Sequence, residues 1–191
     1  QTLRLGVSAR KFKKMSYILE TNRLLMRPFK ASDNEAMFAM DSNPNVHKYL
    51  GNQPLTNIEQ CDEYIKSIQK QYVDNGIGRY VVILKETNEI IGWAGLKFIT
   101  EPENNHVNFY DIGYRFAEAY WGKGYGYEAA KAWLDHAFEV MKVPEVCATA
   151  HAENQGSNKI LQKIGLQQNG QYLHYDMLCN WYELKNNTST L

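Results

Sequence analysis

Residues 120–130, Tyr-Trp-Gly-Lys-Gly-Tyr-Gly-Tyr-Glu-Ala-Ala, join a glycine-rich loop to the start of an amphipathic helix. Glycine lets a backbone approach a ligand closely and adopt conformations that a Cβ atom forbids. A helix that begins directly after such a loop offers unpaired N–H groups and the positive end of its dipole. The stretch therefore favours a phosphate-binding site, although glycine-rich turns before helices also occur without any ligand.

Hydrophobic periodicity and turn residues predict an α/β (mixed α+β) chain in the order β-α-α-β-β-β-α-β-α-β-β. The expected strands cover residues 24–29, 80–84, 90–96, 108–116 and 146–150, with two more in 171–185. The expected helices cover residues 32–41, 56–75, 125–141 and 157–164. The helix at 56–75 opens on a capping-box pattern, with Thr56 at the cap and Glu59 three residues later.

Length and composition restrict the class of protein. A chain of 191 residues forms most simply one domain. No apolar run reaches the ~18 residues of a membrane span and no secretory signal is visible, so we expect a soluble protein with no membrane partner. Three cysteines and five histidines show no metal-ligand spacing, so we expect no metal and a reducing, cytoplasmic environment. Among the histidines, only His151 is a candidate site residue.

Charge is unevenly distributed, although the formal net charge is +0. Residues 1–14 carry basic and no acidic side chains, which leaves the remainder with a net charge of about −5. We interpret 1–14 as a disordered leader, either an upstream extension or a cloning remnant, because Met15 looks like a natural start. The alternative is a basic arm for nucleic acid, but the body lacks a basic face with interleaved aromatic residues, so no nucleic-acid partner is expected. One domain is expected at 15–185, followed by a frayed tail at 186–191.

Four segments together resemble the GNAT superfamily of acyl-CoA N-acetyltransferases, and specifically the branch of the ribosomal-protein N-terminal acetyltransferases. They are Leu-Glu-Thr-Asn-Arg-Leu-Leu-Met-Arg-Pro-Phe at 19–29, Asp-Ile-Gly-Tyr-Arg-Phe at 111–116, the loop and helix at 121–130, and Asn-Gln-Gly-Ser-Asn-Lys-Ile-Leu-Gln-Lys-Ile-Gly-Leu at 154–166. The resemblance spans about residues 17–185. It implies the GNAT fold: a central, twisted, mostly antiparallel sheet of about six to seven strands, splayed at the cofactor site and flanked by about four helices.

The resemblance also implies acetyl-CoA as the co-substrate. In the family's loop pattern, Q/R-x-x-G-x-G/A, Gly124 and Gly126 match, and Trp121 replaces the Gln or Arg. Backbone amides of the loop would bind the pyrophosphate. The strands at 109–116 and 146–150 would separate and take the pantetheine arm as an added strand.

The residues implied to contact the cofactor come from three places. Arg115 and Phe116 would act through their backbone, and Lys123 would either add charge or remain a solvated surface lysine. Asn154 and Ser157 would contact the cofactor or merely cap the next helix. The complete implied set is Arg115, Phe116, Trp121, Gly122, Lys123, Gly124, Tyr125, Gly126, Tyr127, Asn154 and Ser157.

Acetyl transfer to an amine calls for a base. By resemblance, Asp111 is the first candidate because many relatives have a carboxylate beside the acetyl group. The alternative for Asp111 is a structural acid that binds loop amides or pairs with a lysine. Glu101 and Glu103 in the preceding loop are further candidates for the base.

The family's usual acid, a tyrosine on the last helix, is replaced by Leu161 in this chain. Ser157 would protonate the departing thiolate, as a serine is thought to do in the ribosomal branch, or Tyr172 or Tyr175 would replace it. A thiol with a pKa of about 8.5 is also a good leaving group without a strong acid.

The leading hypothesis is an enzyme that transfers acetyl from acetyl-CoA to a primary amine, with a protein or peptide N-terminus as the first acceptor class. Small amines such as polyamines, aminoglycosides or amino acids are the alternative. A third hypothesis, from another class, is a non-catalytic acyl-CoA sensor, which the missing tyrosine keeps open. The chain would act as a monomer or a homodimer.

Overall fold

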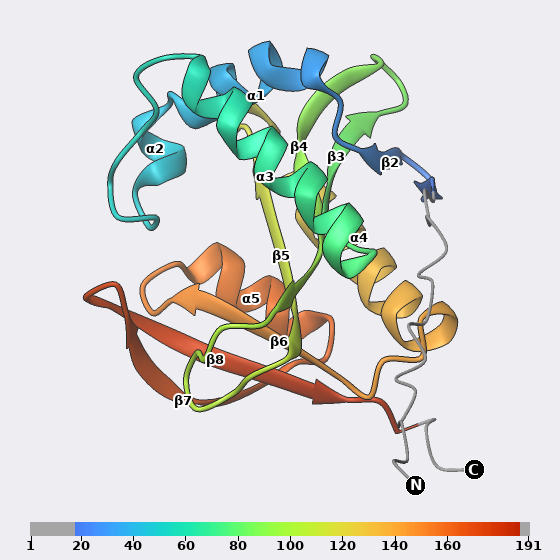
Figure 1. Cartoon of the computed structure of the whole chain (residues 1–191), viewed down its shortest axis with the longest axis vertical. Helices are drawn as coiled ribbons and strands as arrows, with labels where there is room; N and C mark the ends of the chain where they lie inside the picture. The colour runs from blue at the N-terminus through green and yellow to red at the C-terminus, as the bar shows by residue number, and fades with distance from the viewer. Residues whose placement is uncertain (1–17, 188–191) are drawn as a thin grey trace, which may run out of the picture.

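The computed structural model describes residues 18–187 and shows one eight-stranded sheet with five α-helices in that range (Figure 1). Its strands are β1 (Leu19–Glu20), β2 (Leu24–Pro28), β3 (Arg79–Leu84), β4 (Glu89–Ile99), β5 (Phe109–Phe116), β6 (Glu145–His151), β7 (Gln167–His174) and β8 (Met177–Lys185). Its helices are α1 (Asn34–Asp41), α2 (Pro44–His47), α3 (Glu59–Asn75), α4 (Tyr125–Asp135) and α5 (Gln155–Lys163). The leader expected at 1–14 lies outside the described residues.

The strand order is β1-β2-β3-β4-β5-β6-β8-β7, and every neighbouring pair is antiparallel except β5 and β6. β4 pairs with β5 at every position from Phe109 to Phe116. The parallel β5 and β6 pair only at Tyr110 with Val146 and at Asp111 with Cys147. The mostly antiparallel sheet that separates in its middle is therefore confirmed.

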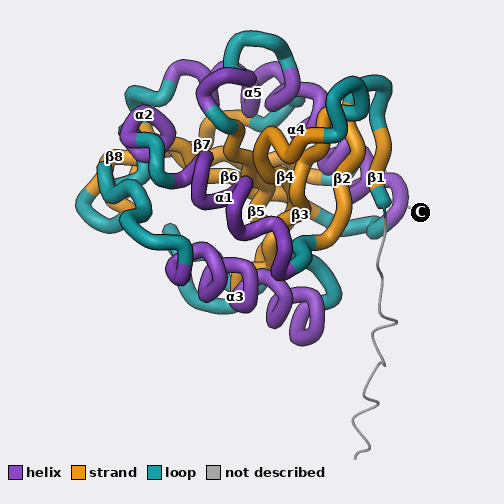
Figure 2. The backbone as a smooth tube through the Cα atoms, turned by 90° about the horizontal axis from the view of Figure 1, so that it is seen from above, coloured by secondary structure: helices purple, strands orange, loops and turns teal. Residues whose placement is uncertain are grey.

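Helices cover both faces of the sheet, and Figure 2 shows α3 and α5 on opposite sides. On one face, α1 and α3 pack on β3 and β4 through a core that includes Met37, Ile65 and Trp93. On the other face, α4 and α5 form the larger core, where the fully buried Trp133 packs edge-on against Tyr80 of β3. The amphipathic patterns of α3 and α4 thus identified the faces that pack on the sheet.

Four local features differ from the sequence-based expectation. β1 and the single-turn α2 are additional elements, and both are too short to give a periodic signal. α4 ends at Asp135 and continues as a π-helical turn, His136–Val140. The capping box of α3 lies one residue later than expected, because Asn57 and Gln60 exchange backbone-to-side-chain hydrogen bonds of 3.2 Å each.

Asn186, expected to fray, is buried, and its N–H donates to the Pro144 carbonyl (2.8 Å).

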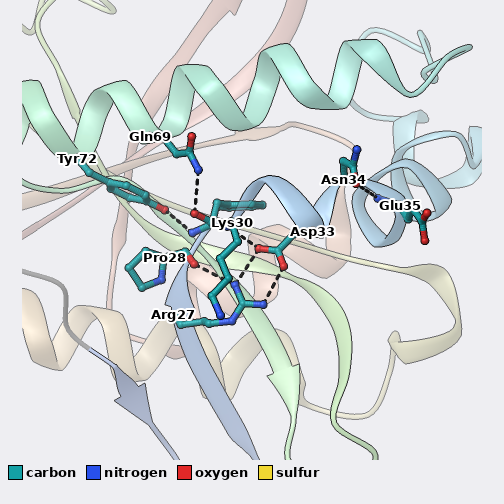
Figure 3. A network of polar contacts seen from close by, with 9 residues as sticks. Arg27, Pro28, Lys30, Asp33, Asn34, Glu35, Gln69 and Tyr72 are labelled. Atoms are coloured by element: carbon teal, nitrogen blue, oxygen red, sulfur yellow. Dashed lines mark hydrogen bonds and ion pairs between the residues drawn. The ribbon is translucent and has the colours of Figure 1, made fainter.

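A polar network fixes the end of β2 against α3 (Figure 3). The Arg27 guanidinium donates two hydrogen bonds of 2.8 Å to the Asp33 carboxylate, which also accepts from the Lys30 N–H (2.7 Å). On α3, the Tyr72 hydroxyl accepts from the Phe29 N–H at 3.1 Å. Because Asp33 is almost fully buried, this pairing satisfies a charge that burial would otherwise make costly.

All three cysteines are free and buried in the structure. Burial raises the pKa of the Cys61 thiol to about 11 and that of the Cys147 thiol to about 12, with smaller contributions from neighbouring carboxylates. Burial also raises the pKa of Cys179. Within residues 18–187, no helix combines the length and the apolar character needed to cross a membrane.

Candidate functional site

The glycine loop forms a backbone cradle at the start of α4. Gly122 and Gly124 have φ angles of +72° and +83°, which are strained for residues with a side chain. Gly124 is the residue preceding α4, and the first hydrogen bond of the helix runs from the Glu128 N–H to the Gly124 carbonyl (3.1 Å). The N–H groups of Tyr125, Gly126 and Tyr127 therefore precede the helical ladder. This geometry fits a pyrophosphate, because these donors and the helix dipole meet at the loop.

Side chains around the loop fix its position rather than fill it. Gly126 packs closely on α5, since a Cβ atom there would lie 3.0 Å from Ile160 Cδ1. The Lys163 ammonium of α5 lies 4.4 Å from the ring centroid of Tyr127. The ammonium group of Lys123, the candidate phosphate-binding side chain within the loop, lies 5.3 Å from the ring centroid of Tyr120.

An ion pair that sequence reasoning missed ties the loop to the segment before β2. The Glu128 carboxylate accepts from the Thr21 hydroxyl (2.6 Å), the Arg23 N–H (3.0 Å) and Arg23 Nε (2.7 Å). Arg23 Nη1 in turn donates to the Lys123 carbonyl at 3.0 Å, inside the loop. Two signals in the sequence could have pointed to this pair. Glu128 lies in the first turn of α4, and Arg23 lies in a segment that resembles the family.

The edge of β5 that faces β6 has no strand partner at residues 112–116, and we call it the open edge. The Ala117 N–H donates to the Ile91 carbonyl at 3.0 Å, so Ala117 faces β4. In an antiparallel pair every second residue hydrogen-bonds to the partner strand, so the N–H and C=O groups of Arg115 also face β4, whereas those of Phe116 face the open edge. The Phe116 carbonyl accepts from Trp121 Nε1 at 2.7 Å. The register therefore favours Phe116 over Arg115 for the expected backbone contact.

The Arg115 side chain has a structural partner. Its Nη1 donates to Asp41 Oδ1 at 2.8 Å, which links β5 to α1. Its guanidinium also lies 5.2 Å from the ring centroid of Trp93. Arg115 thus positions β5 against the helix that covers it.

Asn154 and Ser157 meet at the start of α5. The Asn154 side chain caps the helix by accepting from the Ser157 N–H at 3.1 Å, and its contact with the cofactor stays a prediction. Ser157 Oγ lies 3.2 Å from the hydroxyl of Tyr114, which projects from β5. Burial is the main cause that raises the pKa of Tyr114, so this hydroxyl stays protonated beside Ser157.

Asp111 is ion-paired. Its carboxylate accepts a hydrogen bond from Arg79, whose Nη1 also donates to the Asp111 carbonyl (2.7 Å) and to the Gly95 carbonyl. Burial raises the pKa of the Asp111 carboxyl, and the Arg79 guanidinium opposes that shift. The structural alternative for Asp111 therefore has a defined partner, and its role as the base stays a prediction.

Glu103 and Tyr172 meet on the same face of the sheet. The Tyr172 hydroxyl donates to Glu103 Oε1 and lies 2.9 Å from Thr149 Oγ1 on β6. Glu101, Glu103, Tyr172 and Tyr175 line a cavity of about 340 Å³, bounded by residues 101–104 and 172–175, which we call the β7 pocket. The structure thus brings together candidates that lie far apart in the sequence.

Two other candidates lie elsewhere. His151 packs against the Tyr49 ring at 5.2 Å between centroids, and its Nδ1 accepts from the Glu153 N–H at 3.1 Å. Leu161 is buried in the core under α5, so no ionisable group replaces the usual tyrosine at that position. Residues 18–187 contain no group of three or more His, Cys, Asp or Glu side chains that could hold a metal ion.

Known proteins are similar to this chain in sequence and in fold. Residues 23–167 match the family model described as an acetyltransferase (GNAT) domain. The chain is 30% identical over 158 residues to the uncharacterized N-acetyltransferase p20 of Bacillus licheniformis, covering 83% of this chain and 86% of that protein. It is 26% identical over 156 residues to the spermidine N(1)-acetyltransferase of Escherichia coli K12, covering 78% of this chain and 75% of that protein.

A solved structure extends the comparison to the fold. RimL, the ribosomal L7/L12 alpha-N-protein acetyltransferase in complex with coenzyme A, has a TM-score of 0.76 with 17% identity. The match covers 91% of this chain and 100% of that chain. At this level of identity the likeness concerns the fold alone.

Proposed function

Because the chain belongs to the GNAT family of acetyl-CoA-dependent N-acetyltransferases, we propose that it acetylates the α-amine of a protein or peptide N-terminus. The observation that carries the proposal is the arrangement around β5. The glycine loop and the open edge lie at one end of the separated strands, and the β7 pocket lies on the face that Glu103, Thr149 and Tyr172 share. A thioester and an amine would thus approach one another from different directions.

The cofactor side of the reaction would depend on backbone groups. The N–H groups of residues 122–127 would bind the pyrophosphate, and the open edge of β5 would pair with the pantetheine arm. Ser157, beside the protonated Tyr114 hydroxyl, would supply a proton to the thiolate. These assignments are supported by the positive φ angles of the loop and by the short pairing of β5 with β6.

The shape of the β7 pocket favours an N-terminal amine. One of its walls is the end of β7, the last strand in the sheet order, so its outer edge has no strand partner in residues 18–187. An extended peptide could leave the pocket along this edge while its amine stays inside. Its two acidic lining residues, Glu101 and Glu103, lie on one short loop and match one positive charge better than several separated ones.

Small amines are the second candidate acceptor class. The observation that favours them is the 26% identity to a spermidine N(1)-acetyltransferase. The two lining carboxylates of the β7 pocket are also compatible with a polyamine end.

Thiol release from acetyl-CoA, measured with purified protein and a panel of acceptors, tests the proposal. Short peptides with free N-termini are expected to support turnover, while the same peptides with an acetylated N-terminus are not. Spermidine, aminoglycosides and amino acids are expected to give a kcat/KM at least tenfold lower. A preference for any of these small amines over every peptide would overturn the proposed acceptor class.

We also propose a cytoplasmic location, because buried free thiols suit a reducing compartment. The chain would be a monomer or a homodimer there, with no nucleic-acid or membrane partner. Light scattering of the purified protein distinguishes the two oligomeric states.

A further inference from the structure

The Glu103 carboxylate is held through only one of its two oxygens. Oε1 accepts from the Tyr172 hydroxyl, and it lies 3.5 Å from Thr149 Oγ1 and 3.4 Å from His174 Nδ1. Within residues 18–187, Oε2 has no hydrogen-bond or ion-pair partner. The carboxylate is therefore oriented by the protein and still has one oxygen available at the β7 pocket, which Glu103 lines.

The turn that carries Glu103 is itself fixed. Glu103 and His106 exchange two backbone hydrogen bonds of 2.9 and 2.8 Å around Asn104 and Asn105, which have φ angles of 45° and 63°. The His106 ring lies 4.8 Å from the Trp181 ring, and its Nε2 lies 3.0 Å from Glu183 Oε1 on β8. A tight turn anchored on the sheet holds Glu103 more precisely than a free loop would.

Glu103 and Asp111 differ in the charge that faces them. Asp111 is neutralised by Arg79, which is itself buried. Among the described residues, no lysine or arginine contacts Glu103. Its basic neighbour is His174, which is charged only when protonated, and the Asp111 carboxylate is close enough for the Glu103 charge to raise its pKa. A cationic acceptor entering this face would therefore find its counter-charge at Glu103 and not at Asp111.

Thr149 places Glu103 where the strands part. Thr149 lies on β6 two residues beyond Cys147, the last β6 residue paired with β5. Its hydroxyl contacts both Glu103 and Tyr172. The acidic group is thus next to the point at which β5 acquires its open edge.

We infer that Glu103 binds the acceptor ammonium group through Oε2 and accepts its proton, with Tyr172 as the positioning residue that orients the carboxylate. This inference rests on the proposed amine acetylation. Glu103 first takes one proton from the ammonium group and passes it to solvent through the pocket, which leaves a neutral amine with a lone pair. As this nitrogen bonds to the thioester carbon, the carbonyl electron pair moves onto oxygen, and the nitrogen becomes more acidic and gives a second proton to Glu103. The carbonyl re-forms as the C–S bond breaks with its electron pair on sulfur, Ser157 protonates the thiolate and recovers its proton from solvent, and Glu103 returns its second proton to solvent.

Kinetics of three variants as a function of pH test the inference. We expect Glu103→Gln to lower kcat/KM for the preferred acceptor about 100-fold at pH 7, because a positioned base contributes on this order. The loss should narrow to less than about tenfold at pH 9.5, where a peptide α-amine with a pKa near 7.7–8.0 is already neutral. Tyr172→Phe should cause a smaller loss of about tenfold. Glu139→Gln, at an exposed glutamate in the π-helical turn that follows α4, is the matched control and should change kcat/KM less than about threefold.

Coenzyme A affinity, measured by calorimetry, should stay within twofold of wild type in all three variants. A Glu103→Gln variant with wild-type kcat/KM, or with the same loss at every pH, overturns the inference. A Glu103→Gln variant that no longer binds coenzyme A has lost more than the carboxylate. Glu103→Asp then replaces it in the test, and its loss of kcat/KM is expected to be larger at pH 7 than at pH 9.5. If a small amine is the preferred acceptor, the proposed acceptor class is wrong. The ratio of wild-type to Glu103→Gln kcat/KM at each pH, measured with that amine, still tests this inference. No turnover with any acceptor overturns both.

Discussion

The glycine loop and the β7 pocket are the two halves of the proposed site, and they are built in opposite ways. The loop is a continuous segment, 121–127, in which backbone N–H groups and positive φ angles provide the binding geometry. The pocket depends on side chains such as Glu103 and Tyr172, which are 69 residues apart and meet only because of the sheet order. In this proposal, a local sequence pattern specifies cofactor binding, whereas acceptor choice depends on residues that only the tertiary structure brings together.

Asp111 lies on β5 beside Cys147 of β6, and its substitution sharpens the comparison most. Asp111→Asn leaves the buried Arg79 without its charged partner, so we expect the free energy of unfolding to fall by about 3 kcal/mol. Denaturant unfolding measures this change. The exposed pair Lys70–Asp74 provides the control, since Asp74→Asn should cost less than about 1 kcal/mol. A stable Asp111→Asn variant that has lost turnover would instead support Asp111 as the base.

The loop would be broken by a side chain at Gly124. Gly124→Val adds a branched Cβ at a φ of +83°, so we expect coenzyme A affinity to fall about 100-fold, equivalent to about 2.7 kcal/mol, by calorimetry. Gly51 has a φ of +78° and nothing within 4 Å of an added Cβ, whereas a Cβ at Gly124 would lie 3.4 Å from Arg23 Nη2, so Gly51→Val is a control for backbone strain alone. Equal affinities in the two variants would contradict the cradle assigned to the loop.

The Arg23 tether should have a smaller effect on the same half of the site. Arg23→Ala removes the hydrogen bond to the Lys123 carbonyl and leaves Glu128 without its cation. We expect coenzyme A affinity to fall about fivefold, equivalent to about 1 kcal/mol, because the guanidinium is partly exposed. Activity with saturating acetyl-CoA should remain near wild type, so a loss of kcat alone would argue against a tethering role.

The smallest expected effect is on the pH dependence of stability. Burial raises the pKa of Glu128, but hydrogen bonds from Thr21 and Arg23 outweigh it and the net pKa is lowered. Glu128 therefore stabilises the fold above its unfolded pKa of about 4.3, and this contribution is lost as the pH falls through the folded value. Glu128→Gln should flatten the loss of unfolding free energy between neutral and acidic pH. In an Arg23→Ala background the same substitution should change that slope less.

Sequence reasoning predicted the elements that have strong local signals. The periodic stripe of α3, the hairpin of β3 and β4, and the loop before α4 all lie close to their expected positions. The shift of the α3 capping box to Gln60 shows the limit of such patterns, because two adjacent candidates differ by one residue and only the helix geometry selects between them.

The parts of the site that the sequence did not reveal are long-range pairs. Arg23 and Glu128 are 105 residues apart, and Arg79 meets Asp111 across β4. No periodicity or motif links such residues. Their pairing follows from strand order and register, which a single sequence specifies only through the complete fold.

The buried cysteines have a practical consequence for enzymology. The pKa of Cys147 is raised to about 12, and none of the three thiols is exposed, so almost no protein thiolate is present near neutral pH to react with a disulfide reagent. Colorimetric titration of released coenzyme A should thus have little background from the folded protein. A cysteine introduced on the surface, for example at the rim of the β7 pocket, would then be the main site for a fluorophore or spin label.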